Sequence, residues 1–177
     1  MDKSSVSIFR QKKFLLPFLS AAIAMLMGAL IFILPPPLSA QLHETKADQY
    51  LSVTVTPEVT IELDERSAIT VTNSEPPSVE LLMGNAFFDR KKTSVDAQNA
   101  QKLEITVGDV RFLDMGASFS LETLRNGGSI AIANGQIEMN IGGQSRLISA
   151  GQRIDFDNKR VIDESSIVGL NIASWRR

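Results

Sequence analysis

The chain has 177 residues, carries a formal net charge of −2 and contains no cysteine. The lack of cysteine excludes disulfides, thiolate metal sites and a cysteine nucleophile. The acidic balance, with no basic stripe interleaved with aromatic residues, argues against a nucleic-acid-binding surface.

The first patterned segment is an uncharged apolar run over residues 14–34. As a helix rising about 1.5 Å per residue it is roughly 30 Å long, which matches the hydrocarbon core of a bilayer. The thirteen residues before it hold four basic residues against one aspartate, a net charge of +3. By the positive-inside rule we predict a cytoplasmic arm over 1–13, a transmembrane helix over 14–34, and the remainder across the membrane.

A cleavable signal peptide is the alternative for this N-terminal region. A basic start and an apolar run precede the small residue Ala40, after which cleavage would leave a mature chain beginning at Gln41. The apolar run is longer than the usual signal core of roughly 7 to 15 residues, which favours an uncleaved anchor. Both alternatives export the rest of the chain.

Three consecutive prolines over 35–37 end the apolar run, and a polar stretch follows, so we predict a spacer over 35–49. From residue 50 onward apolar residues recur at every second position, which is typical of β-strands. An Asn-Gly pair and a Gly-Gly pair between such runs predict hairpin turns at Asn134-Gly135 and Gly142-Gly143. We therefore predict an all-β domain over 50–177, built as a barrel, a sandwich or a short solenoid.

Two segments depart from the alternating pattern. Residues 90–102 are polar and are predicted to form a surface loop, with the basic group Arg90, Lys91 and Lys92 as solvated charges. Near the C-terminus, Ser165 or Ser166 is in a position to cap a final short helix that carries Trp175. Trp175 is interpreted as a lid over the β core.

Nothing in the sequence predicts catalysis. The one histidine, His43, lies in the polar spacer, where a rigid triad is not expected. Two acidic groups, Glu62 with Asp64 and Asp155 with Asp157, are spaced to share the wet face of a strand. We predict no catalytic residue, no metal site and no cofactor.

Five small-residue and aromatic signatures occur in a fixed order between residues 84 and 175. They are Gly84-Asn85-Ala86-Phe87-Phe88, Gly116-Ala117-Ser118-Phe119, Asn134-Gly135-Gln136-Ile137, Ala150-Gly151-Gln152 and Trp175. In this order they resemble the periplasmic part of the FecR family of single-span regulators of extracytoplasmic-function sigma factors. Asn85 and Ala117 depart from the acidic residue and the threonine of the family pattern. The predicted structural motif residues are Gly84, Phe87, Phe88, Gly116, Phe119, Gly135, Gly151 and Trp175.

The resemblance implies an all-β, solenoid-like or sandwich-like domain in the periplasm of a Gram-negative bacterium, anchored in the inner membrane. It also implies a signal relay made by protein contacts, with an envelope protein or a separately encoded regulator as partner. The predicted arm of 13 residues is too short for an ordinary interface with a sigma factor, so direct sigma-factor binding is not expected. The chain ends at Arg177, where the family pattern continues with a further strand and a transducer-contact region.

We therefore expect an unpaired sheet edge near the C-terminus, where a partner could add a strand, at Ile154, Phe156 and Val161. The alternative function is that of an exported, non-catalytic β module that binds a glycan or another envelope component. An exposed aromatic platform would favour this alternative, because sugars stack on flat rings.

Overall fold

Residues 39–91, 102–167, 171–173 and 175 are described by the computed structural model, and all of them belong to the unit formed by residues 38–177. They form fourteen β-strands in two sheets and one short 3₁₀ helix, η2 (Asn171–Ala173). In spatial order, sheet A contains β1 (Ala40–Glu44), β4 (Ala68–Thr72), β5 (Ser78–Met83), β7 (Leu103–Val107), β8 (Val110–Asp114), β11 (Gln136–Ile141) and β12 (Gln144–Ser149). Sheet B contains β14 (Val161–Ser166), β13 (Gln152–Asp157), β10 (Gly127–Asn134), β9 (Ser118–Leu124), β6 (Asn85–Arg90), β3 (Val59–Leu63) and β2 (Leu51–Thr56).

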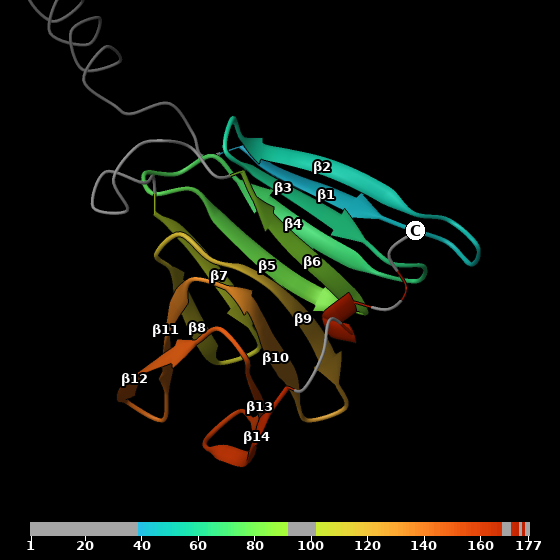
Figure 1. Ribbon diagram of the computed structural model, residues 1–177. Helices are drawn as coiled ribbons and strands as arrows, with labels where there is room; N and C mark the ends of the chain where they lie inside the picture. The colour runs from blue at the N-terminus through green and yellow to red at the C-terminus, as the bar shows by residue number, and fades with distance from the viewer. Residues whose placement is uncertain (1–38, 92–101, 168–170, 174, 176–177) are drawn as a thin grey trace, which may run out of the picture. The chain divides into compact units, whose positions relative to one another are not determined.

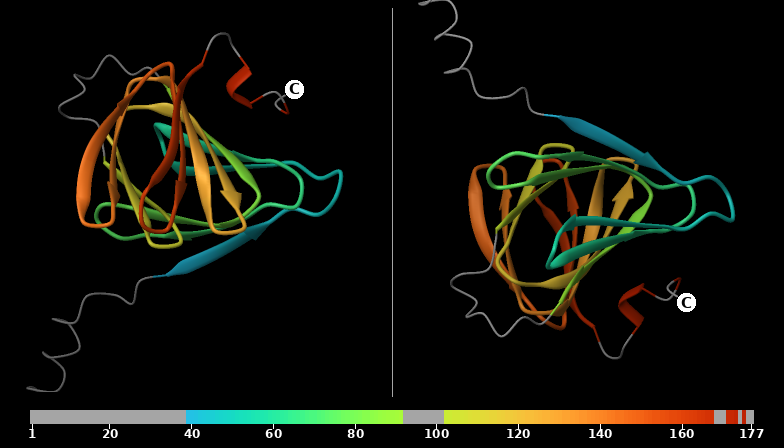
Figure 2. Two further views of the ribbon diagram at one scale, coloured as in Figure 1. Left: turned by 90° about the horizontal axis from the view of Figure 1, so that it is seen from below. Right: turned by 90° about the horizontal axis from the view of Figure 1, so that it is seen from above.

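The chain passes back and forth between the two sheets, usually one hairpin at a time. The hairpins β4–β5, β7–β8 and β11–β12 lie in sheet A, and the hairpins β2–β3, β9–β10 and β13–β14 lie in sheet B. Figure 1 shows the strands of both sheets from the side, and the two views in Figure 2, turned by 90°, show the two layers facing each other. Among the described pairings, β5–β7 is the parallel one, because β6 in sheet B separates these two strands in sequence.

The core lies between the sheets, where alternate residues of each strand point inward. In β9, for example, Phe119 and Leu121 are fully buried, whereas Ser120 and Glu122 on the other face are partly exposed. Burial of each large apolar side chain contributes about 2 kcal/mol. The largest fully buried side chains are Phe88, Phe112, Phe119, Phe156, Ile61, Leu63, Ile69, Leu81, Leu103, Ile105, Leu121 and Ile130.

The predicted all-β class is confirmed, and the two packed sheets make the domain a sandwich. The alternating runs that predicted strands coincide with β2, β3, β4, β5, β7, β9, β10 and β11. Gly142 and Gly143 form the β11–β12 hairpin turn as predicted, with φ of 57° and 77°. Positive φ at both central residues is what a type I′ turn requires.

Three sequence-based expectations were wrong. Asn134-Gly135 does not close a hairpin, because β10 before it lies in sheet B and β11 after it lies in sheet A. The predicted spacer over 35–49 contains β1, which pairs with β4 along its whole length although its side chains are mostly exposed. Ser165 and Ser166 belong to β14 and cap no helix, and the helical structure described near the C-terminus is η2.

The predicted arm over 1–13, the apolar run over 14–34 and positions 92–101 of the predicted loop lie outside the described residues. Arg90, at the start of that predicted loop, is the last residue of β6. In the part of the chain that the structure describes, no helix has the length and apolar character needed to cross a membrane.

Candidate functional site

Four of the predicted motif residues are glycines at the corners where the chain crosses from one sheet to the other. Gly84, Gly116, Gly135 and Gly151 have φ of 82°, 107°, 78° and 85°. Only glycine adopts such angles at little cost. A side chain at Gly135 would also place its Cβ 2.6 Å from the carbonyl oxygen of Gly116. The glycines of the signature therefore shape the corners of the sandwich.

The motif phenylalanines divide between the two faces of sheet B. Phe88 and Phe119 stack inside the core, with ring centroids 4.6 Å apart and planes inclined by 9°. Phe87 points to the outer face and is nevertheless only 5% exposed. The outer face of sheet B is thus not simply a solvated surface.

A buried ionic cluster joins β6 to the β8–β9 corner. Arg90 donates from Nη2 and Nε to Oδ2 of Asp114, at 2.6 Å and 3.1 Å, and from Nη1 to Glu58 at 3.2 Å. The other carboxylate oxygen of Asp114 accepts the backbone N–H groups of Gly116 and Ala117, at 2.8 Å and 2.6 Å. Every charge in the cluster has a partner, so the arrangement positions the corner and offers no free reactive group.

The prediction that Arg90 is a solvated charge was wrong, because its side chain is only 7% exposed. The signal that was missed is the spacing of Asp114 and Gly116. An aspartate two residues before a glycine commonly turns its carboxylate onto the backbone N–H groups that follow. The burial of Arg90 itself depends on strand pairing and is not visible in the local sequence.

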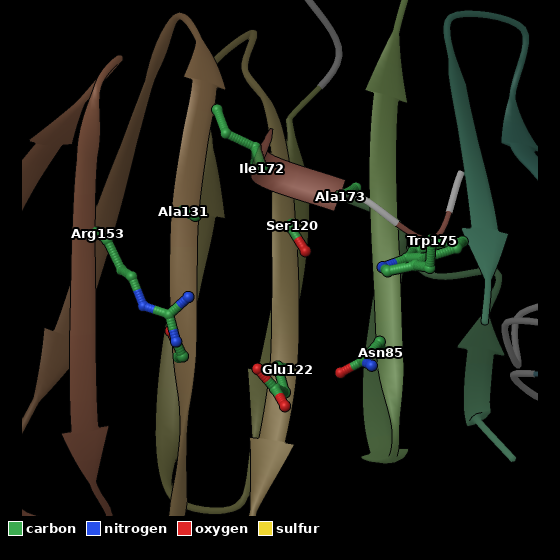
Figure 3. A pocket seen from close by; sticks show the side chains of 9 residues that line it. Asn85, Ser120, Glu122, Ala131, Arg153, Ile172, Ala173 and Trp175 are labelled. Carbon is green, nitrogen blue, oxygen red and sulfur yellow. The ribbon is translucent and has the colours of Figure 1, made fainter. Parts of the chain in front are cut away.

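A polar hollow of about 220 Å³ lies on the outer face of sheet B, next to η2. Asn85, Ser120, Glu122 and Arg153 project into it from β6, β9 and β13, and Trp175 closes one side (Figure 3). Trp175 thus covers the outer face of sheet B and not the core between the sheets. The sequence singled out Trp175 and Asn85 as parts of motifs. It gave no sign that they lie near Arg153, which is distant from Asn85 in the sequence and is brought close by the strand order of sheet B.

A second hollow, of about 300 Å³, lies on the outer face of sheet A. It is lined by hydroxyl and carboxylate side chains, among them Thr70, Thr106, Glu80 and Glu104, and by no aromatic residue. Glu104 already accepts Arg111 Nε at 2.8 Å. Because neither an aromatic ring nor a cation lines this hollow, it offers fewer groups that could bind a ligand.

The three residues predicted at a partner edge divide between two strands, of which only β14 is an edge strand. Ile154 and Phe156 lie in β13, which pairs with β10 on one side and β14 on the other. Both side chains point into the core and are at most 1% exposed. Val161 begins β14, which is one of the two edge strands of sheet B and exposes Ile162 to 65%. The sheet edge near the C-terminus is therefore β14.

The acidic residues that the sequence singled out make local contacts: Asp64 accepts the side-chain amide of Asn85 at 3.2 Å, and Asp155 accepts Arg153 Nε at 3.1 Å. Within the described ranges, no three His, Cys, Asp or Glu side chains are placed to hold a metal ion. Asp157 ends β13 and accepts the backbone N–H groups of Lys159 and Arg160 at 2.7 Å and 2.8 Å. These two hydrogen bonds, together with the nearby charges of Arg160 and Lys159, lower the pKa of Asp157 below its usual value of 3.8. The carboxylate of Asp157 fixes the β13–β14 turn.

Comparison with known proteins gives a family match and a fold match. Residues 41–138 match the family model described as FecR protein. Two crystal structures of "a putative anti-sigma factor" from Parabacteroides distasonis have a similar fold. One has a TM-score of 0.60 at 12% identity over 73% of this chain and 61% of that chain. The other has a TM-score of 0.59 at 13% identity over 72% and 60%.

The chain spans about three fifths of the length of these solved structures. At this identity the likeness shows the fold alone. No curated protein sequence matches the chain significantly.

Proposed function

Since the chain belongs to the FecR protein family, we propose that it is a regulatory protein that relays a signal through protein–protein contacts. The observation that carries this proposal is the family match over residues 41–138, which includes most of the sandwich. The two Parabacteroides structures of similar fold are each described as "a putative anti-sigma factor", and we extend from that description the proposal of a role linked to a sigma factor. Fold similarity alone does not assign function, so the family match has the greater weight.

We place the protein in the inner membrane, with residues 14–34 as a single spanning helix. The N-terminal arm would then be cytoplasmic and the sandwich periplasmic. The uncharged run and the net charge of +3 before it support this orientation. An anchored sandwich would meet its partners within the envelope.

The proposed mechanism involves contact and no chemical step. The buried charges Arg90 and Asp114 satisfy each other, and His43 lies on the edge strand β1 of sheet A. A contact mechanism needs an accessible surface, and the β14 edge offers unpaired backbone groups beside the exposed side chain of Ile162. We propose that an envelope protein or a separately encoded regulator adds a strand at this edge.

Deletion of the gene, followed by measurement of all transcripts, tests the regulatory role. We expect a defined set of promoters to change, and we expect the intact chain to restore it. A second strain would carry residues 41–177 behind a cleavable secretion signal, which exports the sandwich without an anchor. If the proposal is correct, this strain fails to restore regulation. An unchanged transcript profile in the deletion strain would contradict the regulatory role.

A further inference from the structure

The hollow on the outer face of sheet B combines a flat aromatic wall with polar side chains, three of which have no partner among the described residues. The side chains of Ser120, Glu122 and Ser129 make no hydrogen bond or ion pair within the described part of the chain. Arg153 donates through Nε to Asp155 at 3.1 Å, and its terminal nitrogens remain available at the margin of the hollow. Unpaired donors and acceptors that converge beside an aromatic ring are characteristic of a ligand site.

The shape of the hollow limits what can enter it. Its four floor strands, β6, β9, β10 and β13, each have a neighbour on both sides in sheet B, so their backbone groups are already paired. A peptide therefore cannot add a strand there, in contrast to the β14 edge. Sites for drug-sized ligands have volumes of about 300–1,000 Å³. A volume of about 220 Å³ suits a ligand of one ring.

The charges favour a neutral ligand. An anion approaching Arg153 would meet the carboxylate of Glu122 in the same hollow and that of Asp155 beside it. A cation approaching Glu122 would meet the guanidinium of Arg153. A neutral polyol avoids both penalties, because each of its hydroxyl groups can donate to a carboxylate and accept from a guanidinium or a serine.

We propose that this hollow binds one hexopyranose unit, with the apolar face of the sugar ring against the indole of Trp175. Glu122 would accept a hydrogen bond from one hydroxyl group of the sugar, and Arg153 would donate one to a neighbouring hydroxyl group. Ser120, on strand β9 between β6 and β10, would complete the floor of the site. Trp175 thus supplies an aromatic platform of the kind that would favour a glycan-binding role. This sugar site is separate from the β14 edge, so the domain would have a ligand site and a protein-contact surface on different parts of sheet B.

Trp175 is the one tryptophan of the chain, so its fluorescence reports on this site directly. The full chain, in a detergent whose head group carries no sugar, would be titrated with methyl glucoside, methyl galactoside and N-acetylglucosamine. We expect a saturable change in emission with at least one of them. The dissociation constant should be about 1 mM, as suits a small open site. Glycine, a zwitterion without a ring, should give no saturable change.

The variant Glu122→Gln should weaken sugar binding by about tenfold, because a hydrogen bond to a carboxylate is stronger than one to a neutral amide. The matched control Glu80→Gln, on the outer face of sheet A, should leave binding unchanged. Circular dichroism would verify the fold of each variant, and Arg153→Gln replaces Glu122→Gln if the latter does not fold.

An oligosaccharide of N-acetylglucosamine that binds more tightly than the monomer would identify the ligand as a glycan chain, and equal affinity would identify it as a free sugar.

Three results would overturn the proposal: no saturable response to any of the three sugars up to about 50 mM, a response to glycine equal to that of the sugars, or equal binding by Glu122→Gln and Glu80→Gln. None of these results depends on regulation of transcription. The gene-deletion experiment can therefore fail or succeed independently of this titration.

Discussion

Arg90 and Asp114 form a buried ion pair that fixes a sheet-crossing corner, with Arg90 Nη2 2.6 Å from Asp114 Oδ2. Their side chains are only 7% and 1% exposed. The pair links the end of β6 in sheet B to the end of β8 in sheet A, next to the motif glycine Gly116. The signature that begins at Gly116 is thus held in place by Arg90 and Asp114, two charged residues that are not among the predicted motif residues.

Removal of one member of this pair should destabilise the domain strongly. Arg90→Met leaves the carboxylate of Asp114 buried without its cation, and we expect a loss of about 3–5 kcal/mol in the free energy of unfolding. Urea unfolding followed by circular dichroism measures this loss. The control is Arg111→Met, which removes the exposed Arg111–Glu104 pair and should cost less than about 1 kcal/mol. Equal losses in the two variants would show that the buried pair has no special role.

Two glycines with nearly the same φ should respond differently to alanine. Gly135 and Gly143 have φ of 78° and 77°. At Gly135 the new Cβ would lie 2.6 Å from the Gly116 carbonyl oxygen, whereas at Gly143 nothing lies within 4 Å. Gly143→Ala should therefore cost about 1 kcal/mol of backbone strain, and Gly135→Ala about 3 kcal/mol or more. Thermal unfolding of both variants measures the difference, and comparable costs would refute the crowded-corner explanation.

The carboxylate of Asp157 should stabilise the β13–β14 turn only while it is ionised. Because the pKa of Asp157 is lower in the folded than in the unfolded chain, its contribution is complete above the usual value of 3.8. The contribution is lost as the pH falls below 3.8 and passes through the folded value. The difference in stability between the natural chain and Asp157→Asn should then be constant near neutral pH and shrink in acid. A difference that grows in acid would have the wrong sign.

The proposed membrane topology predicts where the C-terminus lies. A phosphatase that is active only after export, fused to the C-terminus, should be active in intact cells. The same enzyme fused after residue 13 should be inactive, because the arm is proposed to be cytoplasmic. Activity from the second fusion alone would reverse the proposed orientation.

Much of the fold could be predicted because burial between two sheets leaves a period-two pattern in the sequence. Ile61 and Leu63 in β3, like Ile130 and Ile132 in β10, alternate with polar or small residues and mark their strands directly. The strand β1 could not be predicted in this way. It lies at the edge of sheet A with mostly exposed side chains, and its pairing with β4 depends on backbone hydrogen bonds.

The corners and the hollow could not be predicted because they depend on topology. Gly135 at a corner and Gly142 in a hairpin turn both need positive φ, and the local sequence does not show whether the next strand pairs back or passes to the facing sheet. For the same reason, two of the three residues predicted at the free edge, Ile154 and Phe156, lie in β13, which is paired on both sides. The hollow unites residues from β6, β9, β13 and the C-terminal segment, whose proximity only strand order determines.

The sandwich is proposed to act through protein contact, with β14 as the contact edge. In living cells, a photo-crosslinking amino acid at Ile162 tests this contact, with the same substitution at the similarly exposed Leu42 of β1 as the control. We expect position 162, and not position 42, to yield a discrete adduct with an envelope protein or a regulator. No adduct from position 162, or the same adducts from both positions, would contradict this proposal.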